Sequence, residues 1–208
     1  MSKKKKYVLV LFIFMACAIY DFGGRVFTDG IYSLLVFYLC YVFLSFESLS
    51  QINVISLYRY GSIKKLYVSY MKEQVCFCLI YTAAFFVCGM ITGVLSAVFD
   101  RGFFVSTGAL IKFLVISYIN LLVVAFFQMA VRLLAGKKNA VIATSSYIFI
   151  SMIQYEIQIY RGITPFVLHT AYFRARNVMT SRTFLNYLVC GILLFLLVYF
   201  SCKKDRKV

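Results

Sequence analysis

Six mainly hydrophobic runs alternate with shorter polar segments along the chain. A helix of about 20 apolar residues crosses the ~30 Å hydrocarbon core of a bilayer, so each run predicts a membrane-spanning helix. The runs are 7–22, 31–48, 75–98, 108–131, 140–160 and 184–202. The expected fold is therefore an all-α polytopic membrane protein, with residues 1–208 forming a single transmembrane domain of six transmembrane helices.

The first run has a second interpretation. Lysines at positions 3–6 precede an apolar stretch that ends in the small residues Ala16, Cys17 and Ala18, as in a signal peptide. We favour a retained helix, because both chain ends then lie on one side of the membrane. The lysines would also snorkel toward water and help this short run to span.

The polar segment 62–72 has the spacing of an amphipathic helix. Ser62 is a suitable N-cap. One apolar face follows the i, i+3, i+4, i+7, i+8 pattern. Its members are Ile63, Leu66, Tyr67, Tyr70 and Met71. Such a helix can lie on anionic lipid or can dock into a cleft of a cytoplasmic partner, and the pattern alone supports the two equally.

Charge and composition fix the orientation that we expect. Hydrophobic residues make up 63% of the chain and charged residues 14%, which excludes a soluble domain of this size. Basic residues cluster before the first run, between runs two and three, between runs four and five, and at the C-terminus. The positive-inside rule therefore places both termini in the cytoplasm. Topology and contact with anionic membrane lipid account for the net charge of +15, and no nucleic acid is needed as a partner.

The predicted outer segment 161–183 departs from this charge pattern, because it carries four arginines. Thr164 and Pro165 form a helix-start signal, so we expect short helices lying on the outer surface. They can anchor the chain to lipid phosphates or can act as an outer gate over an exit path. The residues assigned to this role are Arg161, Pro165, His169, Arg174 and Arg176.

Residues typical of catalysis are sparse. His169 is the only histidine, so a cytoplasmic Cys–His protease site or a histidine-based zinc site lacks its parts. The seven cysteines lie in or beside apolar runs and are interpreted as packing residues. "LLAGKKNA" lacks the upstream glycine and the following hydroxyl of a P-loop. We therefore expect no enzyme activity, no metal and no cofactor bound by this chain.

Two further features concern the spans themselves. Lys112 and Glu156 lie near the predicted outer ends of their spans, where structural pairing is favoured over a transport relay. Gly89 and Gly93 have the spacing that lets two helices approach closely, so they are predicted helix-packing residues.

The segment "LYRYGSIKKLYVSYMKE", residues 57–73, resembles the stretch between the second and third spans of many small ABC-2 family permeases. These are the membrane subunits of bacterial ABC exporters. The six-span layout, with cytoplasmic termini and outer helices between spans five and six, is also similar to that family. The resemblance implies that this segment is a coupling helix that contacts the nucleotide-binding subunit. The residues matched by position are Arg59, Gly61, Ser62, Lys64, Lys65, Leu66 and Tyr67.

The resemblance further implies the partners and the function. A separate P-loop ATPase would bind ATP and magnesium, and a second permease chain, identical or homologous, would face the first across a seam. The expected function is export of a hydrophobic or amphipathic substrate, such as a peptide, a lipid or a drug, across the bacterial cytoplasmic membrane. Three alternatives remain. They are a six-helix substrate-binding subunit of a vitamin importer, a membrane-embedded enzyme, which the missing catalytic constellations disfavour, and a membrane immunity protein that binds a peptide without pumping it.

Overall fold

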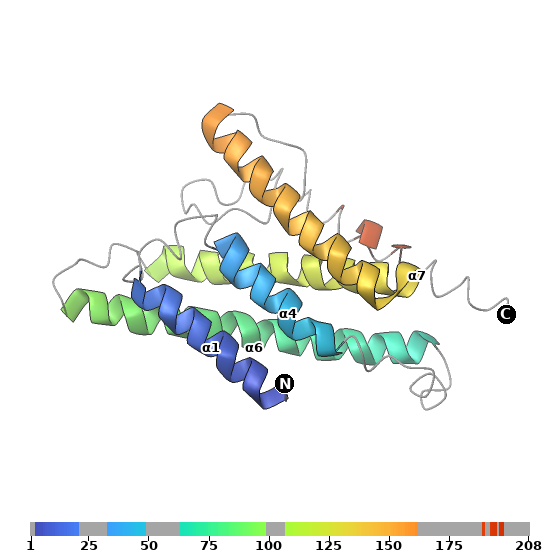
Figure 1. Ribbon diagram of the computed structural model, residues 1–208, viewed down its shortest axis with the longest axis horizontal. Coiled ribbons are helices and arrows are strands. Elements are labelled where there is room, and N and C mark those ends of the chain that lie inside the picture. The colour runs from blue at the N-terminus through green and yellow to red at the C-terminus, as the bar shows by residue number, and fades with distance from the viewer. Residues whose placement is uncertain are drawn as a thin grey trace.

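The computed structural model describes residues 3–20, 33–48, 63–98, 107–161, 189, 192–194 and 196–197. Every element in these ranges is helical (Figure 1). The helices are α1 (Lys3–Tyr20), η1 (Ser33–Tyr38), α4 (Leu39–Ser48), α6 (Ile63–Val98) and α7 (Thr107–Arg161). The all-helical class predicted from the sequence is therefore confirmed for the described part of the chain.

Successive helices run in opposite directions (Figure 1). α6 and the adjoining part of α7 lie lengthwise beside each other, while α1 packs across α6 and α4 packs against α7. The start of α6 and the bend within α7 lie at the same, right-hand end of Figure 1. α1 begins and α4 ends on the side that faces this end. These helix ends therefore point toward the same end of the bundle.

α7 consists of two arms that meet at Gly136. The backbone of Gly136 has φ 85° and ψ 173°, a region that is essentially restricted to glycine. Asn139 Nδ2 donates a hydrogen bond to the carbonyl oxygen of Ala135 at 2.9 Å and so satisfies a carbonyl at the end of the first arm. The first arm (107–135) and the second arm (137–161) contain the runs predicted at 108–131 and 140–160. The non-helical backbone of Gly136 thus falls between these two runs.

α6 is a single uninterrupted helix of 36 residues. Its described part begins at Ile63. Ser62, the predicted N-cap, lies outside the described residues. The sequence placed a boundary between an amphipathic helix at 62–72 and a span at 75–98, and the structure has no break there. Residues 63–87 contain neither glycine nor proline, so nothing in this stretch interrupts the backbone hydrogen bonds. Among the described residues, the stretch of α6 from Met71 to Ile91 is long and apolar enough to cross a membrane.

Aromatic side chains from three helices form the centre of the core. Phe14 of α1 packs edge-on against Phe85 of α6, with ring centroids 4.9 Å apart. Phe37 of η1 lies 4.8 Å from Phe85 and 5.2 Å from Tyr81, measured between ring centroids. Edge-to-face and tilted pairs of this kind stabilise a core beyond the area that they bury. The contacts fix α1, η1 and α6 relative to one another.

η1 is a π-helical segment that continues directly into α4. A change of hydrogen-bond register weakens the backbone ladder where it occurs. Here the hydroxyl of Tyr81, from α6, donates to the carbonyl oxygen of Phe37 at the end of the π-helical segment. A buried side chain of a neighbouring helix therefore supports the irregular backbone.

Candidate functional site

Residues 63–73 of α6 form a projecting segment. Lys65, Val68 and Lys72 are exposed and Met71 is half-buried, whereas Gln74 is the first buried side chain described in this helix. In Figure 1 the start of α6 extends beyond the end of α4. The segment therefore lies outside the packed core, yet it belongs to the same continuous helix as the candidate span.

The residues predicted to bind a partner lie at or before this segment. Arg59, Gly61 and Ser62 are outside the described residues. For five others the structure gives the backbone position in the first turns of α6: Ile63, Lys64, Leu66, Tyr67 and Tyr70. Lys65 and Met71 are described in full, and α6 places them on one helix with the rest of the segment.

The other predicted residues are spread along the chain. Gly89 is buried within α6, and Gly93 is a helical residue one turn further on. Arg161 is the last residue of α7, and the backbones of Lys112 and Glu156 lie within α7. The remaining residues assigned to the outer gate lie outside the described residues: Pro165, His169, Arg174 and Arg176. The helix-packing role of the two glycines and the outer gate both stay predictions.

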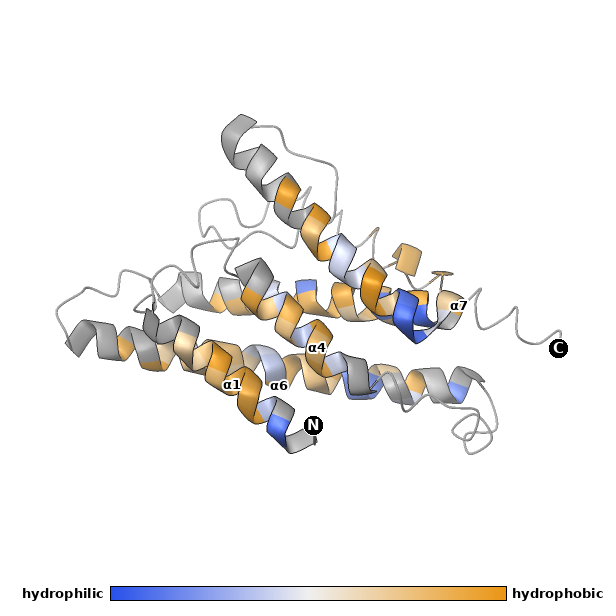
Figure 2. Cartoon of the chain, viewed as in Figure 1, coloured by the Kyte–Doolittle hydropathy of each residue, from blue (hydrophilic) through white to orange (hydrophobic). Residues whose placement is uncertain are grey.

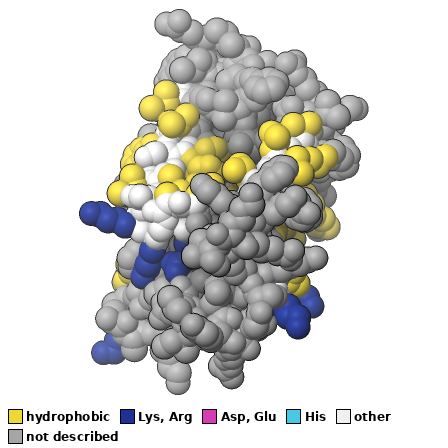
Figure 3. All heavy atoms as spheres, turned by 90° about the vertical axis from the view of Figure 1, so that its right-hand side faces the viewer, with side chains coloured by type: hydrophobic (Ala, Val, Ile, Leu, Met, Phe, Trp, Pro, Cys, Tyr) yellow, Lys and Arg dark blue, Asp and Glu magenta, His cyan; other side chains and the backbone are white. Residues whose placement is uncertain are grey.

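Basic side chains accumulate at the end that carries the projecting segment. Lys65 and Lys72 on α6 share this end with Lys137 and Lys138 at the bend of α7 (Figures 1 and 2). In Figure 2 hydrophilic residues mark the start of α1, the start of α6 and this bend, while hydrophobic residues dominate the helices between. Figure 3 views this end and shows several Lys and Arg side chains projecting from it. The end therefore presents a positive surface.

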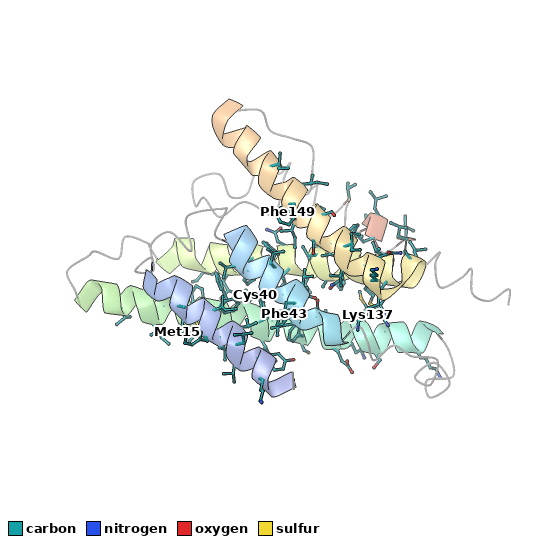
Figure 4. The ribbon with its side chains drawn as sticks, viewed as in Figure 1. Met15, Cys40, Phe43, Lys137 and Phe149 are labelled. Carbon is teal, nitrogen blue, oxygen red and sulfur yellow. The ribbon has the colours of Figure 1, made fainter. Side chains whose placement is uncertain are left out.

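The outward faces of the helices are apolar. Val75, Leu79, Ile80, Val87 and Ile91 of α6 are all exposed. Phe12 of α1, Phe43 of α4 and Phe149 of α7 are exposed too, and the last two are labelled in Figure 4. Contiguous exposed apolar surface is rare on soluble monomers and is typical of membrane or protein contact.

Polar side chains, in contrast, are buried between α4, α6 and α7. Tyr41 of α4 donates a hydrogen bond from its hydroxyl to Oε1 of Gln74 in α6, at 3.0 Å. Ser45, one turn further along α4, donates from Oγ to Oε1 of Gln128 in the first arm of α7, at 2.9 Å. Thr82 of α6 and Ser117 of α7 are also buried, and their spacing from Gln74 and Gln128 returns to one face of each helix. We call this set the polar interface: Tyr41, Ser45, Gln74, Thr82, Ser117 and Gln128.

Three atoms of the polar interface have no hydrogen-bond partner among the described residues. They are Thr82 Oγ1, Ser117 Oγ and Gln128 Nε2. Thr144, in the second arm of α7, behaves differently, because its hydroxyl donates to the carbonyl oxygen of Ala140 at 2.7 Å. A helical hydroxyl can thus be satisfied within its own turn. Thr82 and Ser117 do not use this arrangement in the structure.

The sequence interpretation considered charged groups at membrane depth and missed the polar interface. The available signal was the spacing of uncharged polar residues inside apolar runs. Gln74 and Thr82 lie eight residues apart, and Ser117 and Gln128 lie eleven apart, spacings that return to one face of a helix. Polar residues in apolar helices face the interior of a bundle, so this spacing predicts their burial.

Metal and thiol chemistry finds no support in the described ranges. Within them, no group of three or more His, Cys, Asp or Glu residues could hold a metal ion. Cys78 and Cys88 are buried in the core, in agreement with their interpretation as packing residues, and Cys40 is half-buried. Cys76 is exposed, so its side chain does not fit that interpretation.

Comparison of the chain with protein-family models, with curated proteins and with solved structures found no match.

Proposed function

We propose that the chain is the transmembrane permease subunit of a bacterial ABC exporter. It couples ATP hydrolysis by a separate nucleotide-binding subunit to the export of a hydrophobic or amphipathic substrate, such as a peptide, a lipid or a drug. It lies in the cytoplasmic membrane, with six spans and with both termini in the cytoplasm. The support comes from the distribution of polarity, from the projecting segment and from the resemblance of residues 57–73 to ABC-2 permeases.

A lipid environment accounts for the polarity of the bundle. Ile80 is 67% exposed, whereas Thr82, two residues on in the same helix, is 2% exposed. In water this arrangement is unfavourable, since it leaves aliphatic surface in solvent and removes a hydroxyl from it. In hydrocarbon the exposed aliphatic side chain costs nothing, and the hydroxyl gains by facing other helices. The basic end then faces the cytoplasm, as the positive-inside rule requires.

The observation that carries the proposal is the continuity of α6. The projecting segment bears Lys65, Val68 and Lys72 at the basic end, and the same helix continues through the candidate span from Met71 to Ile91. A helix without a break transmits a push along its whole length, because its backbone hydrogen bonds are unbroken. A force applied to the projecting segment therefore reaches the core residues Tyr81 and Phe85.

The proposed mechanism is mechanical. ATP and magnesium bind to the partner ATPase, whose closure displaces the projecting segment. Two permease chains, the same or homologous, face each other, and movement of α6 shifts the pair between inward-open and outward-open states. The substrate crosses at the seam between the chains. A ligand or partner can shift this equilibrium only by the difference in its affinity for the two states.

Copurification tests this proposal. The full-length chain carries an affinity tag, is extracted from its native membrane in mild detergent, and is purified with everything that remains bound. We expect a P-loop ATPase in the eluate and magnesium-dependent ATP hydrolysis. The variants Leu66→Asp and Tyr67→Asp place a carboxylate on the predicted apolar face and should lose the ATPase while still inserting into the membrane.

A matched control introduces the same charge elsewhere at the basic end. Ala135→Asp changes an exposed residue beside the bend of α7 and should retain the ATPase. Recovery of the ATPase with Leu66→Asp at the yield of the unsubstituted chain would contradict the docking role. Recovery of a small vitamin-like ligand, or of a peptide with no ATPase, would instead support an importer subunit or an immunity protein.

A further inference from the structure

Buried polar atoms without a protein partner are expensive. Leaving such a donor or acceptor unsatisfied costs about 1–3 kcal/mol, so buried polar groups in native proteins are nearly always paired with protein or with ordered water. The polar interface has three such atoms: Thr82 Oγ1, Ser117 Oγ and Gln128 Nε2. The three side chains are 2%, 1% and 1% exposed, so bulk solvent does not reach them directly.

Two hydrogen bonds to α4 allow the positions of these residues along the bundle axis to be compared. We call such a position a level. Tyr41 bonds Gln74 and Ser45 bonds Gln128, and the four-residue step from Tyr41 to Ser45 along α4 corresponds to about 6 Å. Gln128 therefore lies about 6 Å nearer the basic end than Gln74.

The same rise per residue places the two hydroxyls. Thr82 is eight residues beyond Gln74, about 12 Å further from the basic end. Ser117 is eleven residues before Gln128, about 16 Å further from that end than Gln128. Along the bundle axis, Thr82 lies about 18 Å further from the basic end than Gln128, and Ser117 lies about 16 Å further. The two hydroxyls thus lie at the same level, to within one helical turn, on helices that pack together.

Polar side chains also occur at levels between these hydroxyls and the basic end. Gln74 and Tyr41 lie between the two hydroxyls and the Ser45–Gln128 pair. Arg132 follows Gln128 by one turn and is half-buried, and Lys137 and Lys138 lie at the bend beyond it. Polar side chains therefore continue from the exposed basic end to the middle of the bundle, while the outward faces of the same helices are apolar.

We propose that the α6–α7 interface holds an internal water site at the level of Thr82 and Ser117, supplied from the basic end past Gln128. Water donates and accepts, so one molecule can serve both hydroxyls, and another can accept from Gln128 Nε2. The site requires only the packing of α4, α6 and α7, and it is independent of the ATPase. It provides hydrogen-bonding capacity inside a bundle whose exterior faces lipid.

Radiolytic hydroxyl-radical labelling tests the site, with water itself as the probe. The full chain is reconstituted in phospholipid nanodiscs, exposed to a synchrotron X-ray pulse, and analysed by mass spectrometry. Radicals formed from a bound water oxidise the nearest reactive side chains. Tyr118 adjoins Ser117, and Cys78 and Tyr81 adjoin Thr82 along α6. We expect all three to be labelled although Cys78 and Tyr81 are buried, and lipid-facing Leu79 and Ile80 to remain unlabelled.

The variant Thr82→Val with Ser117→Ala removes both hydroxyls with little change of volume. Labelling of Cys78, Tyr81 and Tyr118 should fall well below the labelling of the same residues in the unsubstituted chain. Thr144→Val is the control, because that hydroxyl is satisfied by Ala140 and its loss should leave the labelling unchanged. The single variants Thr82→Val and Ser117→Ala replace the double variant if it does not fold. Absence of labelling in the unsubstituted chain, or undiminished labelling in the variants, would overturn the proposal.

Discussion

Ser45 of α4 donates a hydrogen bond to Gln128 of α7 at 2.9 Å, across 83 positions of sequence. Ser45 Oγ also lies 3.0 Å from the carbonyl oxygen of Val42, one turn earlier in α4. Both residues are buried, and their outward neighbours on the same helices are apolar. The contact therefore joins two helices through their polar faces, as in bundles whose outside is lipid.

Loss of this contact should weaken the α4–α7 interface. Ser45→Ala leaves the amide oxygen of Gln128 without its donor, and we expect a destabilisation of about 1 kcal/mol. Ser146→Ala, on the exposed face of the second arm of α7, should change stability by less than about 0.5 kcal/mol. Reversible unfolding in mixed detergent micelles measures both. Equal effects of the two variants would mean that the bond adds no stability.

Two phenylalanines of α1 distinguish the core from the exposed apolar surface. Phe14 is 2% exposed and contacts Tyr81 and Phe85, whereas Phe12 is 70% exposed. Phe14→Ala should cost about 3 kcal/mol, because two aromatic pairs and the packing around them are lost. If the outer surface faces lipid as proposed, Phe12→Ala exchanges one lipid contact for another and should be close to neutral. Thermal unfolding in nanodiscs compares them, and a larger loss for Phe12→Ala would contradict the described packing.

Gly136 permits the reversal between the two arms of α7. An added Cβ would meet no atom within 4 Å, so the cost of a side chain there is confined to the backbone conformation. We expect Gly136→Ala to destabilise the chain by about 1–3 kcal/mol. Ala135→Ser, at the neighbouring exposed helical position, should be nearly neutral. Chemical denaturation in micelles provides the comparison, and similar unfolding midpoints for the two variants would contradict the conformation at Gly136.

Cysteine labelling tests the orientation. In a background without native cysteines, Lys138→Cys is placed at the basic end and Thr180→Cys in the segment predicted to be outside. A maleimide that cannot cross membranes should modify position 180 in intact cells and position 138 only after lysis. The opposite pattern would reverse the proposed topology.

Helix positions are the part of the fold that could be predicted best from the sequence. Ser62 predicts a helix start, because a hydroxyl side chain suits an N-cap, and the described part of α6 begins at Ile63. The polar residues between the fourth and fifth runs predict a turn, and the chain reverses at Gly136. Both signals are local, since each depends on a few neighbouring residues.

The continuity of α6 differs from the prediction. The change from an amphipathic to an apolar sequence predicts two separate helices, whereas the structure has one. Lys72 and Glu73 separate an amphipathic stretch from an apolar one, but they are compatible with a helical backbone. A change of environment along a helix is therefore no evidence that the helix ends. Only a residue that disrupts the hydrogen bonds, such as proline, gives that evidence.

The polar interface and η1 depend on contacts between distant residues. Tyr81 supports the carbonyl of Phe37 from another helix, and no local pattern in residues 33–38 indicates it. The burial of Thr82 and Ser117 follows from helical spacing, but their common level requires knowledge of which helices pack together. These features arise from tertiary structure, which a single sequence does not specify locally.

Photo-crosslinking from α6 tests the central claim most directly. A photoreactive amino acid replaces Val68 in the projecting segment or Leu79 in the candidate span, both of which are exposed in the same helix. Irradiation of intact native membranes should join position 68 to a P-loop ATPase and position 79 to phospholipid. Crosslinks from position 68 to phospholipid alone, while ATP is being hydrolysed in the same membranes, would contradict the account.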